Sequence, residues 1–480
     1  MGLRSYVQHA RINIQTLKTR GLAVLAIGAG AVAALALIAP AAAFGPHMRY
    51  VGHTAVGTNK SCASPGYTSV QSAVDAANTG DTVYLCGGQF AEQVFVNKSV
   101  TLTGDAGSGL TATGATFSAD DADYPAKFAA DNLFLPQALL VTTGDDVAVN
   151  NLRISGPFTN THACAQNDYG VLALDGKVTL EGDTIADVAD VSSSLYGCQF
   201  GVGVQVGRTY WPSADFASSP VENFTAKAYL NNVTVTGYQK NGITADGVGS
   251  KLFVEHSLVV GGGAAAPFGT IIAQNGMQVS RGATGTVEDN TVADNAYSGS
   301  GYATAAGVLI YGGWGDPLSK DVTVQGNKLI DNDVAVDFVN YSSDGTGPAA
   351  TATKNSASGN WIFSASVTNT TGLCNGGAAC GGQNIGYQAG VQDIGNKDSA
   401  CYNTIVGPGY TEEGSYDYSV TPPVFTQTGA DTALVRTIDA GDTFPTTNFS
   451  SCSYMHVGNG HYGNSFFNFY HGKFGHWFYR

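Results

Sequence analysis

One stretch decides the fold: QNGMQVSRGATGTVEDNTVADN, from Gln274 to Asn295. It has almost no bulky side chains, yet apolar and polar residues alternate on either side of a glycine-containing turn. Alternation with a period of two is typical of a β-strand with one buried face. The pattern therefore predicts a strand that begins at Gly276, with Met277 and Val279 pointing inward, a sharp turn at Asn290 and a further strand after it.

The same pattern recurs along the chain. A short polar residue, usually Asn, precedes an apolar–polar–apolar run, and a Gly-initiated alternating run lies between successive turns. The turn residues are Asn151, Asp183, Asn232, Ser257, Asn290, Asn327 and Asn360, and the Gly-initiated runs lie at 169–176, 200–207, 241–247, 275–282 and 306–313. An irregular repeat of this length indicates a solenoid. The predicted fold is all-β, a single-stranded right-handed parallel β-helix with three strands per coil, in which Asn side chains of neighbouring coils form a ladder. A β-sandwich is disfavoured because the sequence lacks a hairpin series.

A short amphipathic helix precedes the first strands. Thr68 and Gln71 have capping-box spacing, and Gly80–Asp81 turns the chain into the next strand. One apolar helical face carries Val70, Ala73, Val74 and Ala77. Because the end of a solenoid exposes its core, we expect this helix to cap it.

This N-terminal stretch resembles secreted β-helix proteins of the pectin lyase-like superfamily. The resemblance rests on the helix, on GDTV, on the turn Gly88-Gln89-Phe90-Ala91-Glu92 and on the strand VTLTG, and it extends over residues 61–430. It implies the parallel β-helix and a working surface on the solvent face of the first strand of each coil. The superfamily includes lyases, hydrolases, esterases, epimerases and proteins of no known activity, so it does not specify a function.

The first 43 residues differ from the rest. Four basic residues are followed by the apolar run GLAVLAIGAGAVAALALIAPAAAF, which ends in small residues. This pattern predicts a secretory signal over 1–43, and the alternative is a retained membrane anchor. A linker over 44–60, a β-helix over 61–430 and an aromatic, His- and Gly-rich extension over 431–480 complete the predicted organisation. Either interpretation of the signal places the protein outside the cytoplasm, secreted or at the cell surface.

The net charge and the cysteines restrict which partners and which cellular compartment we expect for the protein. Without residues 1–43, Lys+Arg falls from 22 to 18 while Asp+Glu stays at 37, so the net charge is −19. Such a chain repels nucleic acid and anionic membranes. Eight cysteines without a C-x-x-C motif favour disulfides over zinc or redox sites. Proximity favours Cys62–Cys86 and Cys164–Cys198, and the remaining four, Cys374, Cys380, Cys401 and Cys452, can pair in three ways.

Alternation also predicts which side chains face outward on the first strand of each coil. If Ile243, Ala245, Met277, Val279, Val308, Ile310, Val336 and Phe338 point inward, the outward set includes Thr244, Asp246, Gln278, Ser280, Leu309, Tyr311 and Asp337. With coils roughly 4.8 Å apart, Asp246, Gln278, Tyr311 and Asp337 are expected to form a stripe about 15 Å long, with Arg281 and Trp314 in the adjoining turns. Rings that stack on pyranose faces and polar groups that bind hydroxyls suit a sugar. Ordinary surface is the alternative interpretation.

The sets of catalytic residues that the enzymes of this superfamily use are incomplete in this sequence. VAVDFVN (334–340) resembles the pectin methylesterase strand that carries the nucleophilic Asp, which would be Asp337, with Gln278 as an oxyanion-type donor. The second esterase acid is missing, because the coil between them carries Tyr311. A polygalacturonase-type Gly-His-Gly is also missing, and Asp246 and Asp337 lie about three coils apart, which is too far to share a calcium ion without help from loops.

The sequence therefore predicts a secreted or surface monomer that binds a polysaccharide or cell-wall glycan without an intact catalytic set. The alternatives are a polysaccharide-active lyase, hydrolase or esterase-like enzyme that uses the same groove, and a structural surface protein. No cofactor is expected, although calcium remains possible, and the four His among residues 455–480 are not expected to form a metal site because no acid or Cys accompanies them in that stretch.

Overall fold

A computed structural model gives the structure of the protein. It describes residues 46–54, 57–117, 136–160, 164, 167–210, 221–222, 224–299, 303–344, 347–369, 388–410, 413–417, 424–429 and 434–437. The predicted signal segment lies outside these ranges. Most of the C-terminal extension, including its four His, lies outside them as well.

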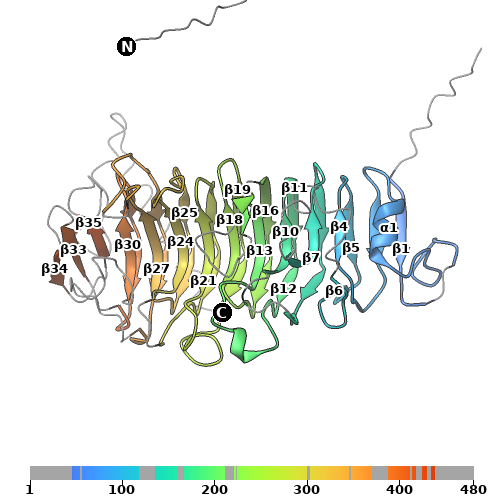
Figure 1. Cartoon of the computed structure of the whole chain (residues 1–480), viewed down its shortest axis with the longest axis horizontal. Helices are drawn as coiled ribbons and strands as arrows, with labels where there is room; N and C mark the ends of the chain where they lie inside the picture. Colours follow the sequence, from blue (N-terminus) through green and yellow to red (C-terminus); the bar gives the residue numbers. More distant parts are fainter. Residues whose placement is uncertain are drawn as a thin grey trace, which may run out of the picture. The chain divides into compact units, whose positions relative to one another are not determined.

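Three long sheets build the fold (Figure 1). We number them in the order in which the chain visits them within a coil. Sheet 1 has twelve strands, sheet 2 has eleven and sheet 3 has ten. From β4 to β30 in sheet 1, and throughout sheets 2 and 3, the neighbours are strands from successive coils, and all pairings in the three sheets are parallel except that of β33 (Glu413–Asp417) with β34 (Val424–Gly429).

The described chain has these elements. Sheet 1 contains β4 (Val94–Val96), β7 (Gln137–Thr142), β10 (Asp168–Ala173), β13 (Val202–Gly207), β18 (Asn241–Asp246), β21 (Asn275–Ser280), β24 (Ala306–Gly312), β27 (Val334–Asn340), β30 (Ala389–Ile394), β35 (Leu434–Thr437), β33 and β34. Sheet 2 contains β1 (Met48–Val51), β2 (Thr82–Leu85), β5 (Thr101–Gly104), β8 (Val147–Asn150), β11 (Asp175–Glu181), β16 (Thr225–Asn231), β19 (Lys251–Glu255), β22 (Thr284–Glu288), β25 (Thr323–Gln325), β28 (Ser356–Ser358) and β31 (Ser399–Cys401). Sheet 3 contains β3 (Gln89–Phe90), β6 (Gly109–Thr111), β9 (Arg153–Ser155), β12 (Thr184–Ala186), β17 (Thr234–Thr236), β20 (Leu258–Val260), β23 (Thr291–Ala293), β26 (Lys328–Ile330), β29 (Trp361–Phe363) and β32 (Thr404–Val406). A short antiparallel pair, β14 (Thr209–Tyr210) with β15 (Val221–Glu222), the helix α1 (Val70–Ala76) and a 3₁₀ turn (Ser193–Leu195) complete them.

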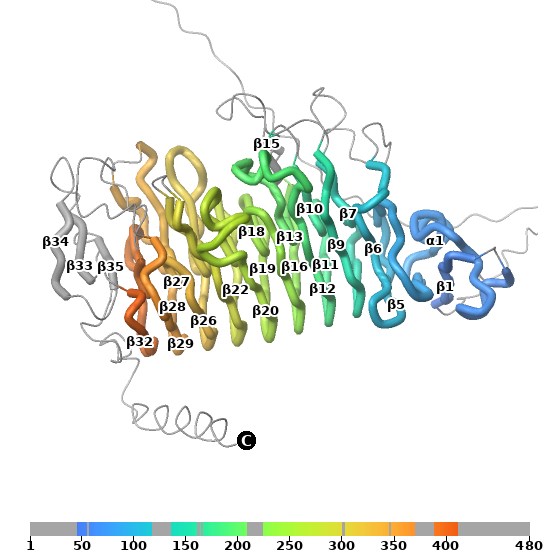
Figure 2. The backbone as a smooth tube through the Cα atoms, turned by 90° about the horizontal axis from the view of Figure 1, so that it is seen from below, coloured from blue at the N-terminus to red at the C-terminus, as the bar shows by residue number. Residues whose placement is uncertain are grey.

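Each coil passes once through each sheet. The coil that begins with β18 continues into β19 and β20 and returns to sheet 1 as β21, and the next coils repeat this path. Figure 2 shows the same succession along the backbone. Parallel crossovers of this kind are right-handed. The predicted right-handed parallel β-helix with three strands per coil is confirmed.

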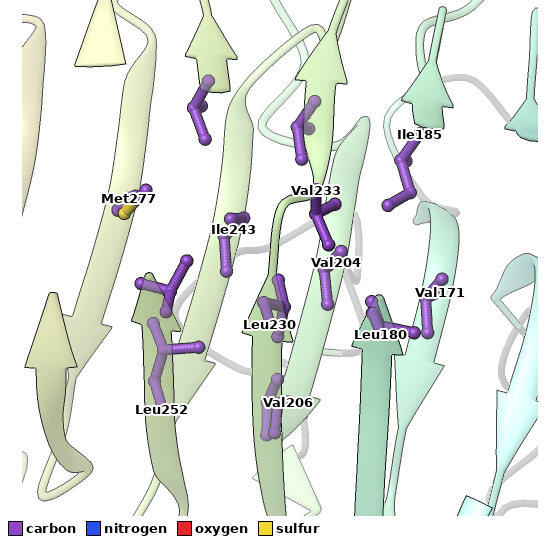
Figure 3. Packing of buried hydrophobic residues seen from close by; sticks show 14 of the residues in the cluster. Val171, Leu180, Ile185, Val204, Val206, Leu230, Val233, Ile243, Leu252 and Met277 are labelled. Carbon is purple, nitrogen blue, oxygen red and sulfur yellow. The ribbon is translucent and has the colours of Figure 1, made fainter. Parts of the chain in front are cut away.

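The core lies between the three sheets. Val204, Ile243 and Met277 point inward from sheet 1 and meet Leu230 and Leu252 of sheet 2, as the close-up in Figure 3 shows. All eight residues that the alternation places inward on β18, β21, β24 and β27 are fully buried in this one core. The inward half of the alternation is therefore confirmed.

The Asn ladder is present, and Asn403 extends it one coil beyond the last predicted position. Asn290, Asn327, Asn360 and Asn403 are buried, and each of the first three donates from Nδ2 to Oδ1 of the next, at 3.1, 3.0 and 2.8 Å. The expectation for Asn151 is wrong by one residue. It adopts a left-handed conformation (φ 56°) just before the ladder position, which Leu152 occupies.

The same correction applies to Asn232 (φ 55°), since Val233 occupies its ladder position. Asn is also the non-glycine residue that adopts this conformation most easily, so an Asn at a turn does not show which of the two neighbouring positions it holds.

A small residue is required early in the sheet 1 strands. A Cβ atom on Gly276 would lie 2.4 Å from Val292 Cγ1 of sheet 3 and 2.7 Å from the carbonyl oxygen of Gly307 in the next coil. The Gly that opens the alternating runs therefore permits close approach between sheet 1 and its neighbours.

The N-terminal helix covers the first coil as predicted, with Val70, Ala73 and Val74 buried against the core. Its cap differs from the prediction. Ser69, rather than Thr68, is the N-cap, and its hydroxyl accepts from the backbone N–H of Ser72 at 3.3 Å.

Glu92 completes this cap. Its carboxylate accepts from the backbone N–H groups of Val70 and Gln71 at 2.7 and 3.1 Å. The Gly-x-Phe-x-Glu turn thus serves the helix, because an acid at a helix N-terminus satisfies N–H groups that lack intrahelical partners.

Two predicted boundaries need revision. Residues 44–60 were expected to be a linker, but they contain β1, which pairs with β2 and extends sheet 2. Sheet 1 likewise continues past residue 430, because β35 pairs with β30. Within the described ranges, no helix is long and apolar enough to cross a membrane.

Both favoured disulfides form. Cys62 bonds Cys86, and Cys164 bonds Cys198. Cys401 is disulfide-bonded too, and the three cysteines among which its partner was sought lie outside the described residues. Disulfides form in oxidising compartments, which agrees with a location outside the cytoplasm.

Candidate functional site

The predicted site residues lie on the outer face of sheet 1, but in two rows instead of one stripe. In the pairing register, Thr244, Gln278, Leu309, Asp337 and Gln392 follow one another in successive coils. The second row, two residues further along each strand, contains Asp246, Ser280, Tyr311 and Val339. The single stripe is therefore wrong, because the strands pair without the two-residue shift that it would need.

This outer face is largely buried, which also corrects the prediction. Asp246 is 1% exposed and Asp337 is 6% exposed. In earlier coils the same face forms a second apolar cluster, in which Phe95, Val141 and Leu172 pack together and Phe224 lies against them. Alternation identifies the two faces of a strand, but it does not say whether other parts of the chain cover the outer one.

Four charged groups meet at the end of the sheet 1 strands. Arg281 binds Asp246 at 3.1 Å through Nη1 and Asp316 at 2.9 Å through Nε. Arg208 lies 3.9 Å from Asp246 and 3.3 Å from Asp316. Among the described residues, two guanidinium groups thus alternate with two carboxylates, and we call these four residues the ion cluster.

The strand ends bring the ion cluster together. Asp246 is the last residue of β18, and Arg208 and Arg281 directly follow β13 and β21, the two strands that pair with β18. Asp316 lies in the turn after β24, one coil further on. Because parallel strands in register end at the same edge, four residues far apart in sequence meet there.

Aromatic rings lie beside the ion cluster. The Arg281 guanidinium lies 4.9 Å from the centroid of the Tyr311 ring, and the ring centroids of Tyr311 and Trp314 are 6.1 Å apart. Trp314 stacks on Tyr341 with ring centroids 4.3 Å apart. Trp314 is 42% exposed, whereas Tyr341 is buried beneath it. Trp314 therefore offers a ring face to solvent above a rigid aromatic base.

Gln278 is connected to the ion cluster through one serine. Its amide donates to Ser280 at 2.9 Å, and Ser280 donates to Asp246 at 3.2 Å. Burial raises the pKa of the Asp246 carboxyl, and Arg281 and Arg208 act against that shift. These contacts hold Asp246 in place behind the exposed groups.

Asp337 does not join this group. It is two coils from Gln278 in the register, with Leu309 between them. Within the described ranges the Oδ1 atom of Asp337 has no hydrogen-bond partner, and neither Oε1 nor Nε2 of the adjacent Gln392 has one. Burial raises the pKa of Asp337 to about 8. The structure thus brings together Asp246, Gln278, Arg281, Tyr311 and Trp314 and leaves Asp337 apart.

Two members of the ion cluster, Arg208 and Asp316, were not predicted from the sequence. Arg208 lies in GRTYWP and Asp316 in GGWGDP, and each motif follows a Gly-rich strand end. A charged residue at the same strand end in several coils is the signal that could have identified them. In the part of the chain that the structure describes, no group of three or more His, Cys, Asp or Glu residues is arranged to hold a metal ion.

No protein-family model matches the chain, and no curated protein matches it. Among solved structures, it is similar to a pectate lyase, with 14% identity, TM-score 0.40 and coverage of 67% of this chain and 76% of that chain. It is also similar to a pectin methylesterase from Aspergillus niger, with 14% identity, TM-score 0.34 and coverage of 59% and 76%. A third similar structure is an alginate lyase from a Paenibacillus species, with 18% identity, TM-score 0.31 and coverage of 65% and 94%.

The three parallel sheets by themselves confirm the parallel β-helix that the sequence resemblance implies. Similarity at this level assigns no activity to the chain and no role to any of its residues.

Proposed function

We propose that this protein is a secreted or cell-surface glycan-binding β-helix whose contact surface is Trp314 with Tyr311 and the ion cluster. The observation that carries the proposal is the exposed Trp314 ring, held by Tyr341 from below and bordered by charged hydrogen-bonding groups. A pyranose ring presents an apolar face that stacks on an indole and hydroxyls around its rim that need polar partners.

Each residue has a distinct part in this proposal. Trp314 and Tyr311 provide the ring surfaces, and Arg281 and Asp316 are the charged groups nearest to solvent that can bind hydroxyls. Asp246 is buried behind them and fixes the direction of Arg281. Gln278 acts one step further back, as a positioning residue, so its loss should weaken binding less than the loss of Trp314.

A rigid arrangement supports binding without prior rearrangement. The contacts with Asp246 and Asp316 hold the guanidinium of Arg281 from two sides, so little side-chain freedom remains to be lost when a ligand arrives. Because the cluster has no excess positive charge, it provides little attraction for a polyanion against the net charge of −15 on the whole chain.

A polysaccharide-active enzyme is the second candidate. The observation that favours it is the buried Asp337, a carboxyl with a raised pKa that stays protonated at neutral pH, as general acids do. In that case Asp246, Gln278, Arg281 and Asp337 would act together on the same face. The separation of Asp337 from the ion cluster in the register places this candidate second.

The first experiment is a retention and turnover screen. The purified chain is incubated with insoluble neutral and uronic polysaccharides, with and without calcium, and both retention and release of reducing or unsaturated sugar ends are measured. Retention without release, lost in Trp314→Ala and kept in Trp361→Ala, supports binding. Trp361 is the matched control because it lies on sheet 3.

Release of product that disappears in Asp337→Ala would support the enzyme instead. Neither retention nor release on any polysaccharide would contradict both candidates and leave a structural surface protein.

A further inference from the structure

A second surface with ligand-binding chemistry lies on sheet 2, on the outer face of β11, β16, β19 and β22, four strands that Figure 2 shows side by side. A hollow of about 470 Å³ opens there. Three rows of side chains cross these strands, each two residues from the next. They are a lysine row (Lys177, Lys227 and Lys251), an aromatic row (Tyr229 and Phe253) and a carboxylate row (Glu181, Asn231, Glu255 and Glu288). Unlike the outer face of sheet 1, this face remains open to solvent.

The aromatic row lines the hollow. Tyr229 and Phe253 are register neighbours whose rings stack at 4.8 Å with an angle of 9° between their planes. In the next coil the row continues with Thr286. Because Thr286 is small, the ring face of Phe253 that is turned away from Tyr229 stands above a step in the surface. A sugar ring placed on that step would stack on Phe253.

The carboxylate row also lines the hollow. Glu181, Asn231, Glu255 and Glu288 follow one another in the register, so Glu255 and Glu288 are direct neighbours at roughly 4.8 Å between strands. Within the described ranges neither glutamate makes an ion pair, and like charges directly opposite one another destabilise a sheet. The pairing of Glu255 with Glu288 is therefore unfavourable for folding, and no ion pair among the described residues offsets it.

We infer that this face is a second glycan site, which takes an uncharged oligosaccharide lying along the coils with one ring on Phe253. Carboxylates accept hydrogen bonds from sugar hydroxyls, and Asn231 can both donate and accept. The same carboxylates repel a uronic acid that is placed beside them, whereas the lysine row on the other side of Phe253 attracts it, so Glu255 and Glu288 are the residues that disfavour acidic chains. The inference does not rest on the proposed function of the Trp314 surface, which lies on another sheet.

The size of the face argues against a second copy of this chain as the occupant. Four coils and five residues per strand cover roughly 14 Å by 16 Å, or about 220 Å², whereas a stable interface needs about 800 Å² from each partner. A short linear ligand fits the hollow better than a protein surface does.

The test uses the full chain with Trp314→Ala, so that the first surface does not contribute. Cellohexaose, mannohexaose and hexagalacturonate are titrated calorimetrically. We expect at least one uncharged hexasaccharide to bind, and Phe253→Ala to weaken that binding about tenfold, the effect of losing one stacked ring. Phe363→Ala is the matched control, because Phe363 is also a half-buried, stacked ring but lies on sheet 3. Phe253→Leu replaces Phe253→Ala if the alanine variant does not fold.

A second readout tests the carboxylates. The double variant Glu255→Gln and Glu288→Gln is expected to gain binding of hexagalacturonate, a result that a purely structural role for these residues would not produce. Absence of binding by both uncharged probes, or unchanged binding in Phe253→Ala, would overturn the inference. A dimer detected by sedimentation and lost in Phe253→Ala would overturn it in favour of a second copy.

Discussion

The Asn ladder offers the sharpest test of how the coils are held together, and Asn327 is one of the two ladder residues whose side chains make four hydrogen bonds. Its Oδ1 accepts from the backbone N–H of Asn290 at 2.9 Å and from the Asn290 side chain at 3.1 Å. Its Nδ2 donates to the carbonyl of Val287 at 2.9 Å and to Oδ1 of Asn360 at 3.0 Å. The change Asn327→Ala removes all four hydrogen bonds at a site without access to water.

The expected loss follows from the groups left behind. The buried N–H of Asn290 loses its partner, and the carbonyl of Val287 loses a donor. An unsatisfied buried group costs about 1–3 kcal/mol, so the free energy of unfolding should fall by about 3 kcal/mol. Asn327→Asp keeps the acceptor and replaces the donor by an oxygen that faces two other oxygens. At neutral pH, Asn327→Asp should therefore lower the free energy of unfolding at least as much as Asn327→Ala does.

Urea unfolding followed by circular dichroism measures both variants. Lys328→Ala is the control, because Lys328 is the exposed neighbour on the same turn, and its change should stay within about 0.5 kcal/mol. The reasoning is refuted if Asn327→Ala unfolds at the same urea concentration as the wild type. That result would mean that the stacked sheets hold the turn without the ladder.

Three further outcomes follow from the structure. Gly276→Ala should lower stability by about 1–3 kcal/mol in urea unfolding, because the new methyl group would overlap Val292. Between about pH 5 and 8, the free energy of unfolding of the wild type should fall more steeply with rising pH than that of Asp337→Asn, by up to about 1.4 kcal/mol per pH unit. The reason is that the pKa of Asp337 is raised in the folded state, so its ionisation opposes folding as the pH rises. Equal slopes for the two proteins would contradict this. Replacing Cys62 and Cys86 together by Ser should cost about 3 kcal/mol, as expected for the 24-residue separation, and an unchanged melting temperature would exclude that contribution.

The sequence predicted what depends on local alternation. Met277 and Val279 point inward because strand geometry gives neighbouring side chains opposite faces, and the core confirms it. The ladder at Asn290 and the Cys62–Cys86 bond were predictable for similar reasons, since a recurring turn residue and a short separation are both visible in one dimension.

The candidate site was predictable only in part. Arg281 and Trp314 were identified because they follow alternating strands, yet the contact of Arg281 with Asp316 depends on how two coils end at one edge. The burial of Asp337 was missed because alternation cannot show what covers an outer face. The hollow beside Phe253 was not predicted, because it lies on the second strands of the coils, whereas the resemblance implies a working surface on the first strands.

The most direct test of the central claim is a calorimetric titration with a soluble oligosaccharide of the polysaccharide that retains the chain. The account predicts that Trp314→Ala weakens binding about tenfold, the effect of losing one stacked ring, while Trp361→Ala leaves it unchanged. Equal affinity of Trp314→Ala and the wild type would contradict the claim that the exposed tryptophan beside the ion cluster is the glycan-binding surface.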